Sequence, residues 1–219
     1  MKKVIFYVDG YNFYHGHKSH TKANPDWKNY YWIDFVKLFS QFVFSHDGQE
    51  LHKVKYFTAV PFDDSKRGKQ NALLGANKIL HGKKFKVING HYSEKLVECK
   101  ALCREDFKVL EEKCSDINLA LNIMQDCIDK SVDIVVIITA DSDHLSTIKL
   151  LKEKFPNVKV RLYFPPNRTS RKLQSMINSV VHLENHEDKF KNAIMPAEVS
   201  KEKKKYIKPS DWKKSSITR

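Results

Sequence analysis

The stretch DIVVIITADSDH, residues 133 to 144, joins an unbroken apolar run to two aspartates, Asp141 and Asp143. A short run of this kind is typical of a strand buried on both faces, as in a parallel sheet covered by helices. In open parallel sheets the ligand crevice lies beyond the carboxyl ends of the strands. Both aspartates are therefore predicted to face such a crevice.

Strand-like and helix-like segments alternate along most of the chain, which is the pattern of a parallel sheet covered by helices. We expect strands over residues 4–8, 54–60, 85–92, 134–139 and 158–164, with a short one near 180–183. Helical spacing of apolar residues is found over 33–44, 69–80, 115–129, 145–155 and 170–177. The sequence predicts an α/β fold with a mainly parallel central sheet and a strand order of roughly 3-2-1-4-5.

The charge balance favours a polyanionic partner. Lys and Arg outnumber Asp and Glu by 39 to 26, which gives a net charge of +13. Part of this charge is clustered, in KKFK (83–86) and KEKKKYIK (201–208). Nucleic acid is the expected partner, and a charge that only keeps the protein soluble is the alternative.

Composition also limits where the protein acts. The chain is 41% hydrophobic and has no apolar run near the roughly 18 residues that cross a bilayer, so no membrane partner is expected. Asp9 interrupts the apolar N-terminal run, which does not resemble a signal peptide, and we expect a cytoplasmic protein. The cysteines form no C-x-x-C pair, which favours reduced thiols, with an irregular zinc site at His91, Cys99 and Cys103 as the alternative.

One domain over residues 1–186 is expected, followed by a basic, flexible C-terminal tail over 187–219. In that tail the apolar pattern fades, and ten Lys or Arg stand against five Asp or Glu. A homodimer is compatible with the sequence, although no residue pattern indicates one.

Four carboxylates are predicted to share one edge of the sheet. Asp9 ends the first strand, Asp116 opens the helix that precedes the fourth, and Asp141 and Asp143 follow the fourth. Carboxylates with a pKa of about 3.9 are ionised at neutral pH and repel one another, so a cation is required. Oxygen ligands select Mg²⁺ or Mn²⁺.

Each aspartate also has a local alternative. Asp143 and Asp116 are suitable helix N-caps, and Asp9 is suited to an Asx-turn in DGYN. Independent caps would not need to gather at one edge of a sheet, however, which favours the joint reading.

Three blocks of sequence resemble the NYN domain family, a branch of the PIN-like ribonucleases that includes the LabA-like proteins. They are FYVDGYNFYHG (6–16), EEKCSDINLALNIMQD (111–126) and VIITADSDHL (136–145). The resemblance extends from residue 1 to about 185. It implies a three-layer α/β, PIN-like (Rossmannoid) fold and a Mg²⁺- or Mn²⁺-dependent endonucleolytic ribonuclease.

The resemblance also implies roles for individual residues. The family's acidic metal positions, which are also its catalytic ones, correspond to Asp9, Asp116, Asp141 and Asp143. Positions that would contact substrate correspond to Asn12 and Lys113. Residues expected to support the ligands from behind are Asn118, Asp126 and Ser142.

A phosphate-binding loop is predicted beside this site. PPNRTSRK (165–172) follows the fifth strand and so opens onto the same edge, which makes Arg168, Arg171 and Lys172 candidate phosphate ligands. Nearby, the rings of Tyr11, Phe13 and Tyr14 offer stacking faces for unpaired bases, although a packed core is the commoner role of such rings.

The chain departs from the family pattern at three places. Thr139-Ala140 stands where Ser-Gly or Ser-Asn is common, His144 where an apolar or aromatic residue is common, and Cys114 where a glycine is usual. These departures bear on activity more than on fold.

Other function classes fit the sequence less well. A module that binds RNA or protein without cutting is the main alternative. A haloacid-dehalogenase-like phosphatase would need an aspartate at Tyr11, and DGYNFYHG is not the G-x-G-x-x-G loop of a dinucleotide-binding enzyme.

Overall fold

The fold is known from a computed structural model that describes residues 1–98 and 106–212, with the backbone alone over 92–98 and 106–112. Six strands form one all-parallel sheet in the order β3-β2-β1-β6-β7-β8. These strands are β1 (Lys2–Asp9), β2 (Gln49–Thr58), β3 (Phe85–Asn89), β6 (Ile134–Ile138), β7 (Lys159–Phe164) and β8 (Val180–His182). The predicted order 3-2-1-4-5 is confirmed, with β8 added beside the fifth predicted strand.

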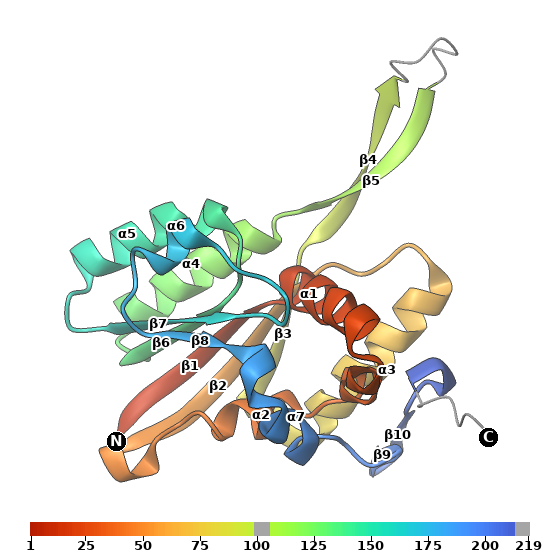
Figure 1. The fold of residues 1–219 in the computed structure, drawn as a ribbon, viewed down its shortest axis with the longest axis horizontal. Coiled ribbons are helices and arrows are strands. Elements are labelled where there is room, and N and C mark those ends of the chain that lie inside the picture. Colours follow the sequence, from red (N-terminus) through yellow and green to blue (C-terminus); the bar gives the residue numbers. More distant parts are fainter. Residues whose placement is uncertain (99–105, 213–219) are drawn as a thin grey trace.

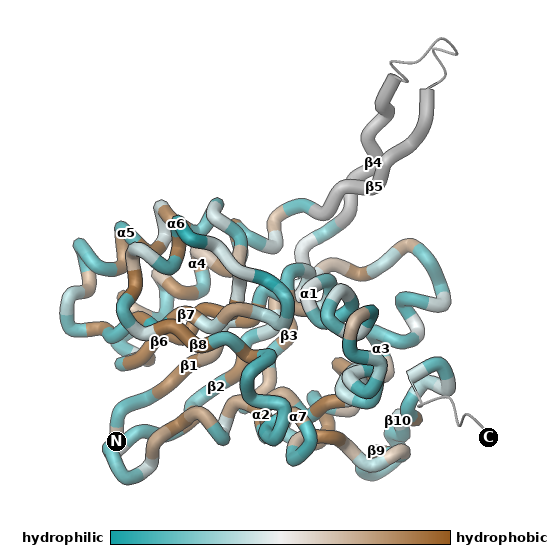
Figure 2. The backbone as a smooth tube through the Cα atoms, viewed as in Figure 1, coloured by the Kyte–Doolittle hydropathy of each residue, from teal (hydrophilic) through white to brown (hydrophobic). Residues whose placement is uncertain are grey.

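Alternation along the central strands produces two cores, one on each face of the sheet. In β1, Val4, Phe6 and Val8 belong to one core, whereas Ile5 and Tyr7 belong to the other. All five side chains are buried. Figure 2 shows these central strands as hydrophobic and the outer helical surfaces as largely hydrophilic. Both faces of the sheet must therefore be covered, as a continuous apolar strand requires.

Helices cover both faces and complete three layers (Figure 1). One face is covered by α1 (Gly10–Ala23), α2 (Phe35–Ser40), α3 (Asp64–His81) and α7 (Glu187–Asn192). The other is covered by α4 (Ser115–Ile128), α5 (Leu145–Lys154) and α6 (Arg171–Gln174). Short 3-10 helices are η1 (Pro25–Tyr31), η2 (Ser45–Asp47), η3 (Gly82–Lys84), η4 (Ser142–His144), η5 (Leu183–His186) and η6 (Ser210–Trp212). The expected three-layer α/β architecture is confirmed.

Helix α1 was not predicted, because its sequence is mostly polar and has a weak apolar stripe. It begins directly after β1, where the Asp9 carboxylate accepts a hydrogen bond from the Asn12 backbone N–H. Gly10 allows the helix to start this close to β2, because a Cβ there would overlap the Tyr56 ring and the Phe57 carbonyl. The helix is then held by the burial of Phe13 and His17.

Helix α4 was predicted correctly, but of the apolar stripe that its spacing predicts (Ile117, Leu121, Met124 and Ile128) only Met124 packs on the core, and Ile117, Leu121 and Ile128 face outward. Each of these three outward side chains is about 60% exposed or slightly more. The side chains that pack on the sheet are instead Leu119, Ile123 and Cys127. Helical spacing identifies a stripe but does not indicate which stripe faces the core.

An antiparallel hairpin follows β3, in a region where the sequence predicts no regular element between residues 92 and 115. Strands β4 (His91–Glu98) and β5 (Asp106–Lys113) pair with each other and project away from the rest of the domain (Figure 1). Cys99 and Cys103 of the alternative zinc site lie outside the described residues.

Residues 187–212, within the expected tail, include α7 and a second hairpin, β9 (Glu198–Lys201) with β10 (Lys204–Ile207). This hairpin packs on α3, where Tyr206 lies directly over Gly75. Trp212 stacks on Tyr31 with 5.6 Å between ring centroids. The boundary at residue 186 stays a prediction. Among the described residues, no helix combines the length and apolar character of a membrane span.

Candidate metal centre

The centre of the site is set by the register between β1 and β6. Val8 pairs with Ile138, so Asp9 and Thr139 emerge side by side where the two strands end. The Thr139 hydroxyl donates to Asp9 Oδ2 at 2.8 Å, and Asn12 N–H donates to Asp9 Oδ1 at 2.9 Å. The same hydroxyl accepts from Asp141 N–H at 3.0 Å. Thr139 thus keeps the hydroxyl of the usual serine and fixes the Asp9 carboxylate.

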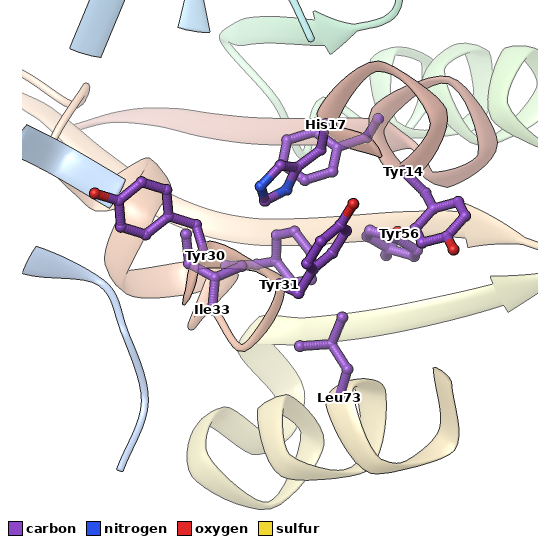
Figure 3. A pocket seen from close by; sticks show the side chains of 9 residues that line it. Tyr14, His17, Tyr30, Tyr31, Ile33, Tyr56 and Leu73 are labelled. Atoms are coloured by element: carbon purple, nitrogen blue, oxygen red, sulfur yellow. The ribbon is translucent and has the colours of Figure 1, made fainter. Parts of the chain in front are cut away.

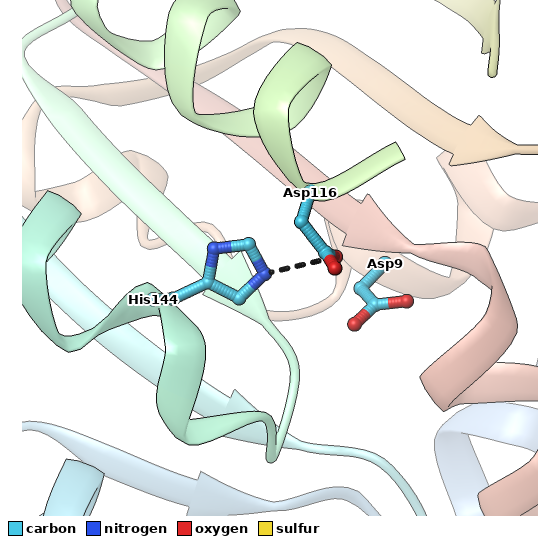
Figure 4. Close-up of side chains that lie close together, drawn as sticks. All are labelled: Asp9, Asp116 and His144. Carbon is cyan, nitrogen blue, oxygen red and sulfur yellow. Dashed lines mark ion pairs between the residues drawn. The ribbon is translucent and has the colours of Figure 1, made fainter. Parts of the chain in front are cut away.

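Asp116 reaches the site from the first turn of α4. Cys114 precedes this helix with φ 70, in the left-handed region where glycine is favoured. A cysteine thus occupies a backbone conformation that favours glycine. Ser115 is buried and Asp116 points toward Asp9 (Figure 4).

His144 completes the group from η4. Its side chain is 1% exposed, and Nε2 lies 3.5 Å from Asp116 Oδ1. That separation is beyond the usual 2.7–3.2 Å range of an N–H···O hydrogen bond. Nε2 is buried and has no hydrogen-bond partner among the described residues. Asp9, Asp116 and His144 each offer one possible ligand atom, and these three atoms lie within 4.8 Å of one another.

Asp141 and Asp143 lie at the edge of this group. The Asp141 carboxylate caps η4 by accepting from Asp143 N–H at 3.0 Å. Asp143 is exposed. In the described part of the chain, the compact group that can hold a metal contains neither of them, and their assignment as ligands stays a prediction. The cap role considered for Asp143 from the sequence is taken by Asp141, two residues earlier, at the start of η4.

The electrostatics of the group favour a cation. Burial raises the pKa of Asp9, although hydrogen bonds from Asn12 and Thr139 oppose that effect. The neighbouring His144 imidazole lowers the pKa of Asp116. Burial lowers the pKa of His144, but the carboxylates of Asp116, Asp9 and Asp141 outweigh burial and raise it overall. The site thus stabilises positive charge placed between these side chains.

The residues predicted to support the ligands lie at different depths. Ser142 belongs to η4, next to Asp141. Asn118 donates weakly to the Asn89 carbonyl at 3.4 Å. Asp126 lies at the far end of α4, where it accepts from Tyr7 and pairs with Lys55, each at 2.6 Å. It therefore anchors α4 to the sheet and does not contact the site carboxylates directly.

The residues predicted to contact substrate surround the site at the same edge. The Asn12 side-chain oxygen accepts from Ala140 N–H at 3.2 Å, which ties α1 to the loop after β6. Lys113 is exposed at the end of β5. Arg168 lies in the loop after β7, and α6, which begins at Arg171 and Lys172, packs beside η4. The side chains of Arg168, Arg171 and Lys172 are all exposed.

A basic and aromatic rim borders the site on the α1 side. Tyr11 and Tyr14 are 50% and 40% exposed, and Tyr11 lies against His15 with 4.2 Å between ring centroids. Burial lowers the pKa of His15, and the charges of Lys18, Arg168 and Lys66 lower it further. We call Tyr11, Tyr14, Lys18, Lys66 and Arg168 the rim. Tyr11, Tyr14 and Arg168 were already candidate RNA contacts from the sequence.

A small cavity lies under α1. It is lined mainly by rings, including Tyr14, His17, Tyr31 and Tyr56 (Figure 3). Its free space is about 20 Å³, which holds about one water molecule. No nucleobase or comparable ligand would fit without displacing these rings.

Comparisons with known proteins give a family match and a named relative. A model of the NYN domain family matches residues 3–184. The chain is 27% identical over 211 residues to a Pseudomonas putida protein named 6-hydroxy-3-succinoylpyridine 3-monooxygenase HspA. That match covers 82% of this chain and 65% of the relative's length. That name describes the relative's own activity.

A solved structure shares the fold. It is a protein of unknown function from Vibrio parahaemolyticus, with a TM-score of 0.50, 19% sequence identity, and coverage of 82% of this chain and 91% of that chain. At this identity the likeness concerns the fold alone.

Proposed function

Because this chain belongs to the NYN domain family, we propose that it is a metal-dependent ribonuclease that hydrolyses phosphodiester bonds of RNA. The observation that carries the proposal is the convergence of Asp9, Asp116 and His144, with ligand atoms within 4.8 Å of one another. The buried Nε2 of His144, which lacks a hydrogen bond within the described residues, supports an ion as the missing partner.

The residues fit a divalent cation, Mg²⁺ or Mn²⁺. Asp9 and Asp116 would hold it. Asp141 and Asp143, which lie within three residues of His144 in the sequence, would bind water or a second ion. A bound divalent ion lowers the pKa of a coordinated water and stabilises charge on the phosphate oxygens. Thr139 would keep the Asp9 carboxylate in one orientation while substrate binds.

RNA is the proposed substrate because of what surrounds the carboxylates. The exposed rings of Tyr11 and Tyr14 can stack on unpaired bases. Lys18, Lys66 and Arg168 are close enough for their charges to lower the pKa of His15, and they can neutralise phosphates, which would make binding salt-dependent. The net charge of +13 supports association with a polyanion.

The experiment that tests the proposal is cleavage of a panel of labelled RNA and DNA with Mg²⁺, Mn²⁺ or EDTA. Wild type is compared with Asp9→Asn and Asp141→Asn. Asp129→Asn, which changes an exposed aspartate at the opposite end of α4, is the matched control. We expect metal-dependent cleavage of RNA that Asp9→Asn lowers on the order of 100-fold and that Asp129→Asn leaves unchanged.

A non-catalytic RNA-binding module is the second candidate, and a specific observation favours it. The carboxylates of Asp116, Asp9 and Asp141 raise the pKa of His144, so a protonated imidazole would itself neutralise part of the site. Under this alternative, wild type binds labelled RNA but cuts none of the panel with any metal.

A further inference from the structure

His144 occupies one of the positions where the sequence departs from the usual NYN pattern. An apolar or aromatic side chain would fill this buried space without polar contacts. The imidazole instead places Nε2 beside Asp116, with Asp9 on the other side of that carboxylate (Figure 4). The substitution therefore adds a nitrogen donor to a site whose other donors are carboxylate oxygens.

The burial of this nitrogen requires a partner. His144 is 1% exposed, and Nε2 makes no hydrogen bond with the described residues. Buried polar atoms in native proteins are nearly always paired with protein, water or an ion. Helix η4 and its cap, formed by the Asp141 carboxylate, hold the ring so that Nε2 points at the carboxylates.

The separation of Nε2 from the Asp116 carboxylate suits a shared ion better than a direct hydrogen bond. Nε2 and Asp116 Oδ1 are 3.5 Å apart. Two ligands bound at about 2.1 Å to one ion lie roughly 3.0 Å apart when adjacent and about 4.2 Å apart when opposite. The observed distance falls within that range and is long for a hydrogen bond to a carboxylate, which is usually about 2.7–2.9 Å.

We infer that His144 is a direct metal ligand, and that the mixed nitrogen and oxygen site selects Mn²⁺ over Mg²⁺. Imidazole nitrogen binds transition metals well, whereas Mg²⁺ prefers oxygen ligands and retains its waters. The inference deepens the proposed function and rests on it for the identity of the site. It adds that this nuclease site is tuned to a transition metal by one side chain.

The variants are chosen to separate coordination from packing. His144→Phe restores an aromatic residue of similar size and removes the nitrogen donor, and His144→Gln keeps a polar side chain of smaller volume if the first variant folds poorly. His52→Phe, a half-buried histidine in the amino-terminal half of β2, is the matched control. Circular dichroism and thermal unfolding in EDTA establish that each variant is folded.

The direct readout is pulsed electron paramagnetic resonance of the Mn²⁺-loaded protein. A coordinated imidazole gives a ¹⁴N coupling at Mn²⁺, and incorporation of ¹⁵N-histidine must change it. We expect this coupling in wild type and in His52→Phe, and its loss in His144→Phe. A wild-type protein that binds Mn²⁺ at this site without nitrogen coupling would overturn the inference.

Calorimetric titration measures the selectivity for Mn²⁺ over Mg²⁺. We expect His144→Phe to weaken Mn²⁺ binding by about tenfold or more and Mg²⁺ binding by much less, so that the preference for Mn²⁺ shrinks. Equal weakening of both ions would overturn the stated selectivity.

Neither readout depends on cleavage. Nitrogen coupling without nuclease activity would therefore contradict the proposed function and leave the metal site standing. Metal-dependent cleavage without nitrogen coupling would contradict the inference about His144 and leave the proposed function standing.

Discussion

Lowering the pH is expected to destabilise this protein through His17. The side chain is 2% exposed, is stacked on Tyr31 with 4.5 Å between ring centroids, and places Nε2 2.9 Å from the Trp27 carbonyl oxygen. Nε2 therefore donates a hydrogen bond as a neutral imidazole. Burial lowers the pKa of His17 to about 4, although the Trp27 carbonyl opposes the shift.

The sign and size of the effect follow from linkage. In the unfolded chain His17 takes up a proton as the pH falls below about 6.5, whereas the folded protein does not until about pH 4. Between these values the unfolded state binds more protons, so the free energy of unfolding falls by up to about 1.4 kcal/mol per pH unit. The full loss from this group is about 3 kcal/mol at pH 4.

The assay is urea denaturation at several pH values between 7 and 4.5, with EDTA present so that metal does not contribute. His17→Gln is the variant, because its amide can donate to the Trp27 carbonyl and cannot take up a proton. His46→Gln removes an exposed histidine and is the matched control. The stability of wild type should fall more steeply than that of His17→Gln, by about 2 kcal/mol at pH 5. Parallel curves for these two proteins would refute the reasoning.

Three further predictions concern the supports of the site. Lys55→Met should lower the free energy of unfolding in urea by about 3 kcal/mol or more, because it leaves the Asp126 carboxylate buried without its cationic partner. The double variant with Asp126→Leu should recover part of this loss. A double variant that is less stable still would contradict the prediction. Cys114→Gly should raise the free energy of unfolding by about 0.5 to 1 kcal/mol in thermal unfolding, because residue 114 has φ 70, which glycine adopts without strain. A lower stability would mean that the cysteine side chain itself contributes to the fold. Thr139→Val should weaken Mn²⁺ binding, measured by calorimetry, about tenfold, because the Asp9 carboxylate loses its hydrogen bond from the hydroxyl. Thr139→Ser keeps that hydroxyl and should bind Mn²⁺ as wild type does. Equal weakening in both variants would show that the hydroxyl does not contribute to metal binding.

Most of the sheet could be predicted because its strands carry their own signal. The five apolar residues from Ile134 to Ile138 are buried completely or almost completely on both faces, and such a run has few other stable placements. Helix α3 shows the limit of this reasoning. Its predicted start, residue 69, lies inside the helix, because Asp63 caps it by accepting from Lys66 N–H.

The elements that sequence reasoning missed depend on distant contacts. Helix α1 has little apolar periodicity, and its buried Phe13 packs on Phe35 from another element. On α4, two apolar stripes compete, and the one that packs on the sheet is identified by its neighbours.

The sequence by itself determined that Asp9 and Asp116 would meet at one edge of a parallel sheet, because carboxylates placed at strand ends and helix starts follow the chain's own pattern. Only the tertiary structure decided which third side chain joins them. Asp141 turns back to cap η4 while His144 turns inward, since the loop after β6 is fixed by the bond from Ala140 to Asn12 on α1. That choice depends on contacts between segments far apart in the chain, which spacing along one segment does not encode.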